Sequence, residues 1–203
     1  MTQARGVPIV ISGPSGVGKG TVIARLRERR PELVLSISMT TRPPRPGESD
    51  GQDYFFVSPP RFEEAIHNQE LVEWARVYAH YYGTPKSFLE QVCSGGRDVI
   101  LDIDTQGAAA IRSIYPEGIL IYMMPPSLDE LRRRLFSRAK GAGDDLEYRL
   151  AQARREFRFL GFYDYLVIND GAEAAADRLY HIVMAARLRR ERTEPDLRAR
   201  GIL

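Results

Sequence analysis

The stretch Gly13-Pro-Ser-Gly-Val-Gly-Lys19-Gly-Thr21 decides the fold, because it follows the apolar run Val7-Pro-Ile-Val-Ile11 and precedes a helical pattern. A buried strand, a glycine-rich turn and a helix start together form a loop whose backbone N–H groups face an anion. Lys19 adds a positive charge for the β- and γ-phosphates. The alternative, a tight turn with a capping lysine, is less consistent with the amphipathic helix that follows. The stretch therefore predicts a nucleoside-triphosphate site.

One position departs from the phosphate-loop pattern G-x-x-x-x-G-K-[ST]. Gly20 stands where serine or threonine is expected, and the hydroxyl group arrives one residue later, at Thr21. In that pattern the hydroxyl binds Mg²⁺, so the departure leaves the magnesium ligand open. The residues expected to bind the triphosphate are Gly13, Pro14, Ser15, Gly16, Val17, Gly18, Lys19, Gly20 and Thr21.

The composition is that of an ordinary globular protein. Of the 203 residues, 43% are hydrophobic and 28% are charged, which allows one α/β domain with a real core. The net charge of +2 is too small to indicate a nucleic-acid partner. A single cysteine, Cys93, excludes an intramolecular disulfide, and we expect its thiol to be buried. We expect no membrane partner and a cytoplasmic location, because neither a membrane span nor a secretory signal is recognisable.

The order of apolar runs predicts an α/β fold in which helices flank a central parallel sheet. Continuous apolar strands at 99–103, 119–123 and 165–168 alternate with helical patterns after the first strand. A strand expected over 33–40 opens a strand-rich insertion, and a small-residue stretch at 139–144 predicts a mobile lid. The expected divisions of this one domain are a core at about 1–32, 85–126 and 162–203, an insertion at about 33–84 and a helical lid at about 127–161.

A second anion-binding group lies far from the phosphate loop in sequence. Arg42 and Arg45 flank a proline-stiffened loop, and Tyr54, Tyr81 and Tyr82 offer hydroxyl groups and stacking faces. Guanidinium groups bind phosphate through two parallel hydrogen bonds, which lysine cannot do. For the two arginines alone, a solvated loop would be an equal alternative, but the neighbouring residues favour a second phosphate site.

Other arginines are interpreted as solvated. Consecutive helical residues point about 100° apart, so Arg132 and Arg133 cannot share the orientation of Arg134. The arginines of the C-terminal tail are interpreted as a solvated helix end rather than a nucleic-acid arm, and they are Arg187, Arg189, Arg190 and Arg192.

The motifs around the second site resemble the guanylate kinase family. The similar segments are Ser36-Ile-Ser-Met-Thr-Thr-Arg-Pro-Pro-Arg-Pro-Gly-Glu-Ser-Asp-Gly-Gln-Asp-Tyr54, Glu73-Trp74, Tyr81-Tyr-Gly-Thr84 and Ile100-Leu-Asp-Ile-Asp-Thr-Gln-Gly107. The resemblance runs from about Val7 to Asp170 in the family's order, and the Gly20-Thr21 ending is associated with bacterial members and with adenylate kinases. It implies an ATP:GMP phosphotransferase that uses Mg²⁺ and ATP to convert GMP or dGMP to the diphosphate, with a GMP-binding insertion and a closing lid.

The resemblance also assigns roles to individual residues. Around the GMP phosphate it places Arg42, Arg45, Tyr54 and Tyr82, and around the guanine it places Ser38, Glu73, Thr84 and Asp104. It implies a catalytic set of Lys19, Arg42, Arg134, Arg138 and Arg149, in which the last three close over the transferring phosphoryl group. Asp102 falls beside the phosphates and magnesium, and Asn169 at the adenine edge. The magnesium ligand stays open between Thr21, Asp102, and water with phosphate.

The chemistry agrees with these residue types. A GMP phosphate is already an anionic nucleophile, so the enzyme must align two polyanions and neutralise their charge rather than supply a base. Guanine presents two adjacent donors that one carboxylate, such as Glu73, can accept. Glu73 and Asp104 disfavour another nucleoside-monophosphate kinase, and Lys19 with the lid arginines disfavours an inactive module that binds phosphorylated peptides. The sequence leaves homo-oligomer formation open.

Overall fold

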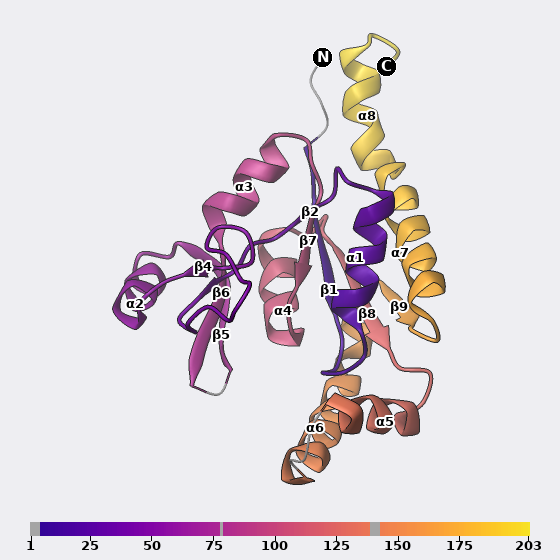
Figure 1. Ribbon diagram of the computed structural model, residues 1–203. Coiled ribbons are helices and arrows are strands. Elements are labelled where there is room, and N and C mark those ends of the chain that lie inside the picture. Colours follow the sequence, from indigo (N-terminus) through magenta and orange to yellow (C-terminus); the bar gives the residue numbers. More distant parts are fainter. Residues whose placement is uncertain (1–4, 78, 139–142) are drawn as a thin grey trace.

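The computed structural model describes residues 5–77, 79–138 and 143–203, and the side chains of residues 138 and 143–145 lie outside this description. Five parallel strands form the central sheet in the order β2-β7-β1-β8-β9 (Figure 1). Their bounds are β1 Pro8–Ser12, β2 Val34–Leu35, β7 Val99–Asp102, β8 Ile119–Met124 and β9 Tyr165–Ile168. The expected α/β fold with a central parallel sheet is confirmed.

Helices cover both faces of this sheet. Helices α1 (Lys19–Arg29) and α7 (Ala172–Arg187) pack on the face that contains Ile9 and Ile11, and α3 (Lys86–Ser94) and α4 (Thr105–Ile114) pack on the face that contains Val10. Because successive strand residues point to opposite faces, a strand buried along its whole length requires this double cover. Cys93 is fully buried in the second layer as expected, and desolvation raises the pKa of its thiol to about 11.

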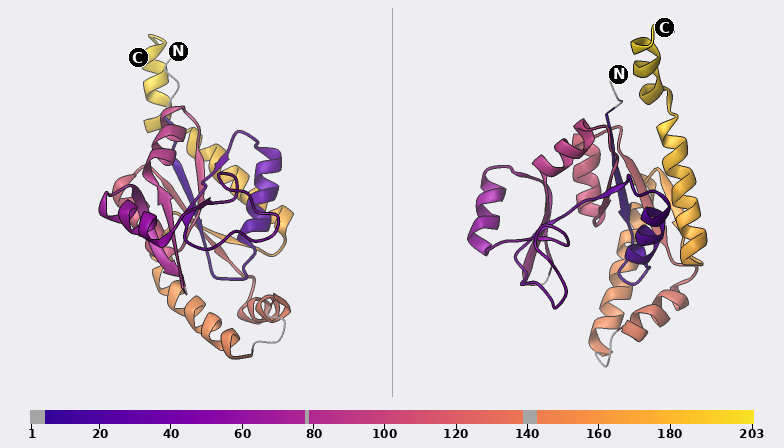
Figure 2. Two further views of the ribbon diagram at one scale, coloured as in Figure 1. Left: turned by 60° about the vertical axis from the view of Figure 1, so that its left-hand side comes forward. Right: turned by 45° about the horizontal axis from the view of Figure 1, so that its top comes forward.

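A smaller four-stranded sheet stands to one side of the core (Figure 2), in the order β4-β3-β6-β5. Its elements are β3 Met39–Thr40, β4 Phe55–Phe56, α2 Pro59–His67, β5 Leu71–Val77 and β6 His80–Pro85. The expectation of one strand over 33–40 is wrong. Val34 and Leu35 pair with β7 in the core sheet, whereas Met39 and Thr40 pair with β6. The alternation of apolar residues continues from the first strand into the second. Such a pattern indicates which side chains are buried but not which strand each segment pairs with.

Helices α5 (Leu128–Arg138) and α6 (Gly143–Glu156), followed by the short 3₁₀ segment η1 (Phe157–Phe162), project from the end of the core (Figure 1). Their own small core joins Leu131 and Leu135 to Leu150. Ser127 caps the start of α5, because its Oγ accepts a hydrogen bond from the N–H of Glu130 at 3.1 Å. Residues 139–142 of the small-residue stretch lie outside the described residues, so the mobile lid stays a prediction.

The C-terminal region corrects one expectation about the tail arginines. Asp98 is fully buried just before β7, and its carboxylate accepts hydrogen bonds from Arg187 Nε and Arg192 Nη2, both at 2.8 Å. It also accepts one from the N–H of Val7 at 3.0 Å. Arg187, the last residue of α7, and Arg192, in the last helix α8 (Arg190–Ala199), therefore anchor the C-terminal helices to the sheet and are not a solvated helix end. Asp98 is about 90 residues away in sequence, so a local pattern could not reveal the pairing.

The expectation for the lid arginines holds, since the Arg132 and Arg133 side chains are 55% and 79% exposed. Among the helices that the structure describes, none has both the length and the apolar character needed to cross a bilayer.

Candidate active site

The glycines of the phosphate loop have conformations that other residues rarely adopt. Gly13, Gly16 and Gly18 have φ values of 151°, 82° and 100°. A Cβ at Gly16 would lie 2.8 Å from the Leu135 side chain, so the loop packs directly on the lid helix α5. Gly18, which has no side chain, occupies the N-cap of α1. The first N–H groups of α1 are thus left for a ligand, at the positive end of the helix.

Lys19 lies between the loop and the end of β7. Its Nζ donates a hydrogen bond to the carbonyl of Gly13 at 2.7 Å and is 3.7 Å from Asp102 Oδ1. The surrounding protein raises the pKa of Asp102 by desolvation, and Lys19 opposes this shift. The lysine and the carboxylate therefore face the same space at the carboxyl edge of the sheet, where α/β proteins bind ligands.

Asn169 and Arg134 both hold the outer side of the phosphate loop. Asn169 is buried, and its Nδ2 donates to the carbonyl of Val17 at 2.7 Å. Arg134 donates from Nη1 to the same carbonyl and from Nη2 to the Asn169 carbonyl, both at 3.1 Å. Its Nε donates to Glu130 at 2.7 Å. The sequence pointed to nucleotide contacts for both residues and did not reveal that they also brace the loop.

The structure describes the side chain of only one of the other two lid arginines. The Arg138 side chain lies outside the described residues, whereas Arg149 belongs to the described part of α6.

Three residues assigned to the second phosphate site lie together in the insertion. The Arg42 guanidinium is 5.3 Å from the Tyr54 ring, and the Tyr54 and Tyr82 rings are 6.1 Å apart. Arg42 binds Glu48 through two parallel hydrogen bonds of 2.8 and 2.9 Å, and Glu48 raises the pKa of Arg42. Arg45 contributes its backbone N–H to Glu48 at 2.7 Å, while its side chain is exposed.

Glu48 is a site residue that the sequence reasoning missed. Its signal was present in the motif Arg-Pro-Gly-Glu, six residues after Arg42. A carboxylate that holds a guanidinium in this geometry uses the two donors that a phosphate would use.

Three of the four residues assigned to guanine, namely Glu73, Thr84 and Asp104, lie together at the first turn of α4. Glu73 Oε1 accepts a hydrogen bond of 2.5 Å from Thr84 Oγ1, and a Cβ at Gly107 would lie 3.0 Å from Glu73 Oε2. Asp104 caps α4 by accepting from the N–H of Gly107 at 2.8 Å, a structural role that the sequence reasoning missed. Burial raises the pKa of Glu73, Asp104 adds to the rise, and Thr84 opposes it. Ser38 lies just before β3, where its carbonyl accepts from Phe55.

A cavity of about 870 Å³ lies where insertion, core and lid meet. It is lined by Arg76 and Val77 of β5, by Asp104 at the start of α4, and by Gln152 and Glu156 of α6. Ligands that touch all three parts of the chain would occupy this space and its rim.

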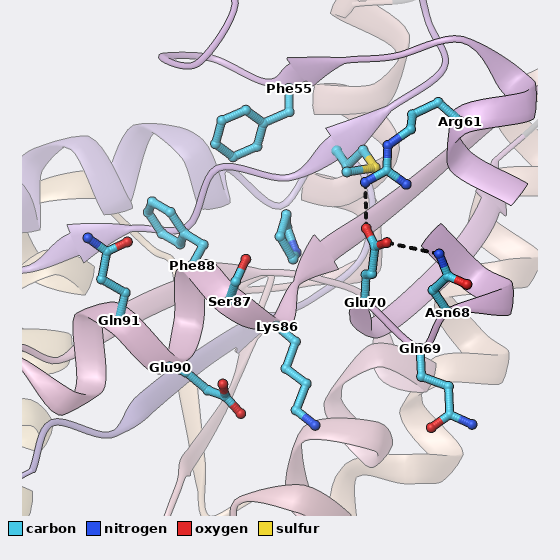
Figure 3. Close-up of a pocket in the computed structure, with 12 residues that line it drawn as sticks. Phe55, Arg61, Asn68, Gln69, Glu70, Lys86, Ser87, Phe88, Glu90 and Gln91 are labelled. Atoms are coloured by element: carbon cyan, nitrogen blue, oxygen red, sulfur yellow. Dashed lines mark hydrogen bonds and ion pairs between the residues drawn. The ribbon is translucent and has the colours of Figure 1, made fainter. Parts of the chain in front are cut away.

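Another cavity, of about 710 Å³, lies between α2, β6 and α3 (Figure 3). Its wall contains Glu70, which pairs with Arg61 at 2.5 Å and with Asn68 at 3.3 Å. Its lining residues include none of those assigned to a nucleotide. Of the residues assigned to a nucleotide, Asp104 lines the cavity of about 870 Å³, and Glu73 lines a further cavity of about 570 Å³ beside the first turn of α4.

Comparisons with known proteins agree on one family. The family model described as guanylate kinase matches residues 5–186. A guanylate kinase of Oceanobacillus iheyensis is 44% identical over 192 residues, which are 95% of this chain and 93% of that protein. One of Bacillus subtilis is 45% identical over 194 residues, 95% of each chain. The crystal structure of guanylate kinase from Anaplasma phagocytophilum superposes with a TM-score of 0.79 at 35% identity, covering 100% of this chain and 99% of that one.

Proposed function

Because the chain belongs to the guanylate kinase family, we propose that its two anion sites are the donor and acceptor halves of an ATP:GMP phosphotransferase. The observation that carries this assignment is that the assigned residues form two separate clusters, one for each nucleotide. The phosphate loop with Lys19 and the Arg42–Tyr54–Tyr82 group come from separate sheets of one domain. The products are ADP and GDP, and dGMP is an alternative acceptor.

In the acceptor half, the phosphate of GMP would replace Glu48 as the hydrogen-bond partner of Arg42. Arg42 holds a carboxylate, Glu48, through the two donors that would bind the GMP phosphate. When GMP binds, its phosphate competes with Glu48 for these donors. Arg45, three residues further along the chain, and the hydroxyl groups of Tyr54 and Tyr82, whose rings lie beside Arg42 and beside each other, would add contacts. The group thus keeps a charged arginine oriented before the substrate arrives, which lowers the cost of ordering it.

The donor half binds ATP through the loop N–H groups and Lys19, with Arg134 and Asn169 on its outer side. Transfer of the phosphoryl group is an in-line displacement that needs alignment and charge neutralisation more than proton transfer. We propose that Arg138 and Arg149, on the two lid helices, complete the neutralisation when the lid closes over both nucleotides. Arg134 keeps the loop and α5 together during this movement, since it is bonded to Val17 and Glu130.

Magnesium fits this arrangement through few protein ligands. Among the described residues there is no group of three or more His, Cys, Asp or Glu side chains able to hold a metal. Magnesium in kinases is bound by one or two protein groups together with substrate phosphates and water. Asp102, beside Lys19, and Thr21, in the first turn of α1, are the residues that would contribute. When bound, the ion would supply positive charge that offsets the negative charge of the phosphates.

An ADP-release assay across GMP, dGMP, AMP, UMP and CMP, with ATP and Mg²⁺, tests this function. We expect turnover with GMP and dGMP, and about 10⁴-fold lower efficiency with AMP, whose ring would present a lone pair to Glu73. Equal rates with GMP and AMP would contradict the base assignment. Binding of a phosphorylated peptide without any ADP release would instead support the inactive module, which Lys19 in its loop geometry disfavours.

Glu73→Gln should weaken GMP selectively. The amide can accept from only one of the two adjacent guanine donors and turns its NH₂ group toward the other. We expect the KM for GMP to rise on the order of 100-fold, because hydrogen bonds to charged groups are worth about 1.5–3 kcal/mol each. The KM for ATP should stay within about twofold, since the loop is unaffected. Steady-state kinetics with each nucleotide varied in turn would measure both.

Two controls sharpen this result. Glu70→Gln removes a carboxylate three residues away that pairs with Arg61 outside the site, and it should leave both KM values unchanged. In the wild type, the KM for GMP should rise as the pH falls through the pKa of Glu73, which is raised above the ordinary value of about 4.3. The ionised form binds, so protonation weakens binding, and Glu73→Gln should lack this rise. Equal losses for ATP and GMP would indicate general damage.

A further inference from the structure

The lid joins the core at one buried tyrosine. Tyr122 is fully buried in β8, and its ring contacts Phe157 at 6.3 Å and Tyr163 at 5.0 Å between centroids. These two residues lie at the start of η1 and just after its end. The segment through which the lid returns to the sheet therefore packs around the Tyr122 ring.

A hydrogen bond between Tyr122 and Glu156 also fixes how the end of α6 is oriented on the sheet. Tyr122 donates from its hydroxyl to Glu156 Oε2 at 2.9 Å, and Glu156 is the last residue of α6. The contact joins the end of the lid helix to β8, which lies between β1 and β9 in the sheet. Glu156 also lines the cavity where insertion, core and lid meet.

A partly buried carboxylate such as Glu156 is an unfavourable choice at the end of a helix if its role is only structural. A carboxylate at the C-terminal end of a helix opposes the helix dipole. Burial raises the pKa of Glu156 and Asp104 adds to the rise, while the Tyr122 hydrogen bond and the charge of Lys19 lower it. A residue that breaks local preference in this way is commonly found where function requires it.

The helix geometry connects Glu156 to the reaction. Arg149 lies seven residues earlier in α6, so the two side chains project from nearly the same face, two turns or about 10 Å apart. We propose that Glu156 is a positioning residue for phosphoryl transfer: bound to Tyr122, it sets the position and rotation of α6 and thereby aims Arg149 at the phosphate loop. This inference rests on the proposed function, in which Arg149 acts when the lid closes.

Tyr122→Phe tests the hydrogen bond while keeping the ring contacts with Phe157 and Tyr163. We expect kcat to fall about tenfold, the value of one hydrogen bond to a charged group. The KM values for ATP and GMP should stay within about twofold, because the groups that bind the two ground-state nucleotides are untouched. A merely structural defect would instead raise both KM values together with a loss of thermal stability.

Glu156 variants separate the bond from the side chain. Glu156→Ala should match Tyr122→Phe, and Glu156→Gln should recover most of the lost kcat, because its amide oxygen accepts the same bond. Combining Tyr122→Phe with Glu156→Ala should cost no more than either alone, since both remove one interaction. Tyr115→Phe, another buried tyrosine in the same layer, is the matched control and should leave kcat unchanged.

A second readout does not depend on activity. In the ligand-free protein, amide hydrogen exchange in residues 146–156 should be about tenfold faster in Tyr122→Phe than in the wild type, with α7 unchanged as an internal reference. A wild-type protein without GMP-dependent ADP release would contradict the proposed function, whereas the exchange result would still stand. Unchanged exchange together with a kcat within twofold of the wild type would overturn the positioning role.

Discussion

Lys19→Ala is expected to lower kcat for GMP phosphorylation about a thousandfold, the upper end of the range for removing one hydrogen-bond donor that stabilises a transition state. In the structure, Lys19 Nζ contacts the Gly13 carbonyl at 2.7 Å and faces Asp102 at 3.7 Å, at the loop that we propose binds the β- and γ-phosphates. Its loss removes the positive charge and leaves the Asp102 carboxylate facing phosphate oxygens. Rapid-quench or steady-state ADP release at saturating nucleotides would measure the change.

Folding should be little affected by this substitution. The Asp102 side chain is 40% exposed and can be hydrated when its partner is removed, so the stability change should stay within about 1 kcal/mol. Arg190→Ala removes a positive charge from α8, where the side chain is 82% exposed, and it should keep normal turnover. Near-normal turnover of Lys19→Ala would overturn the assignment of the phosphate loop.

The phosphate loop was predictable because its information is local. The glycines that need positive φ, the lysine and the helix that follows are contiguous in sequence, and backbone sterics alone restrict what they can form. The same holds for the parallel strands, whose continuous apolar runs require cover on both faces. Within the insertion, Arg42 and Tyr54 could be grouped from the sequence because they belong to one short motif, and their phosphate-binding role stays a prediction.

The parts that sequence reasoning missed depend on partners that only folding brings together. Asn169 reaches the loop across 152 residues to bond Val17, and a polar residue at a strand end carries no sign of that partner. The family resemblance assigned Asp104 to the guanine. It did not reveal that the Asp104 carboxylate caps α4 by accepting a hydrogen bond from the N–H of Gly107. The hydrogen bond between Tyr122 and Glu156 joins an apolar strand to a charged helix end, and each residue alone has an ordinary explanation.

Asp98→Ala is expected to cost about 3–5 kcal/mol of unfolding free energy, because it removes the shared partner of two partly buried cations. Arg187 and Arg192, whose side chains are 28% and 15% exposed, would lose their carboxylate, and the N–H of Val7 would lose its acceptor. For a chain of this length the melting temperature should fall by roughly 10 °C. Urea unfolding, followed by circular dichroism, would give the free energy directly.

A carboxylate in an exposed ion pair is the control that shows whether burial causes the loss of stability in Asp98→Ala. Asp177→Ala breaks the ion pair with Arg29 on the surface, where the two side chains are 54% and 37% exposed, and should cost at most about 1 kcal/mol. Asp98→Asn keeps an acceptor for Val7 but not the charge, so an intermediate loss is expected and remains measurable if the alanine variant does not fold. The phosphate loop lies at the opposite ends of the strands, so kcat of the folded Asn variant should be normal. An Asp98→Ala loss no larger than that of Asp177→Ala would mean that hydration of Arg187 and Arg192 replaces the buried carboxylate.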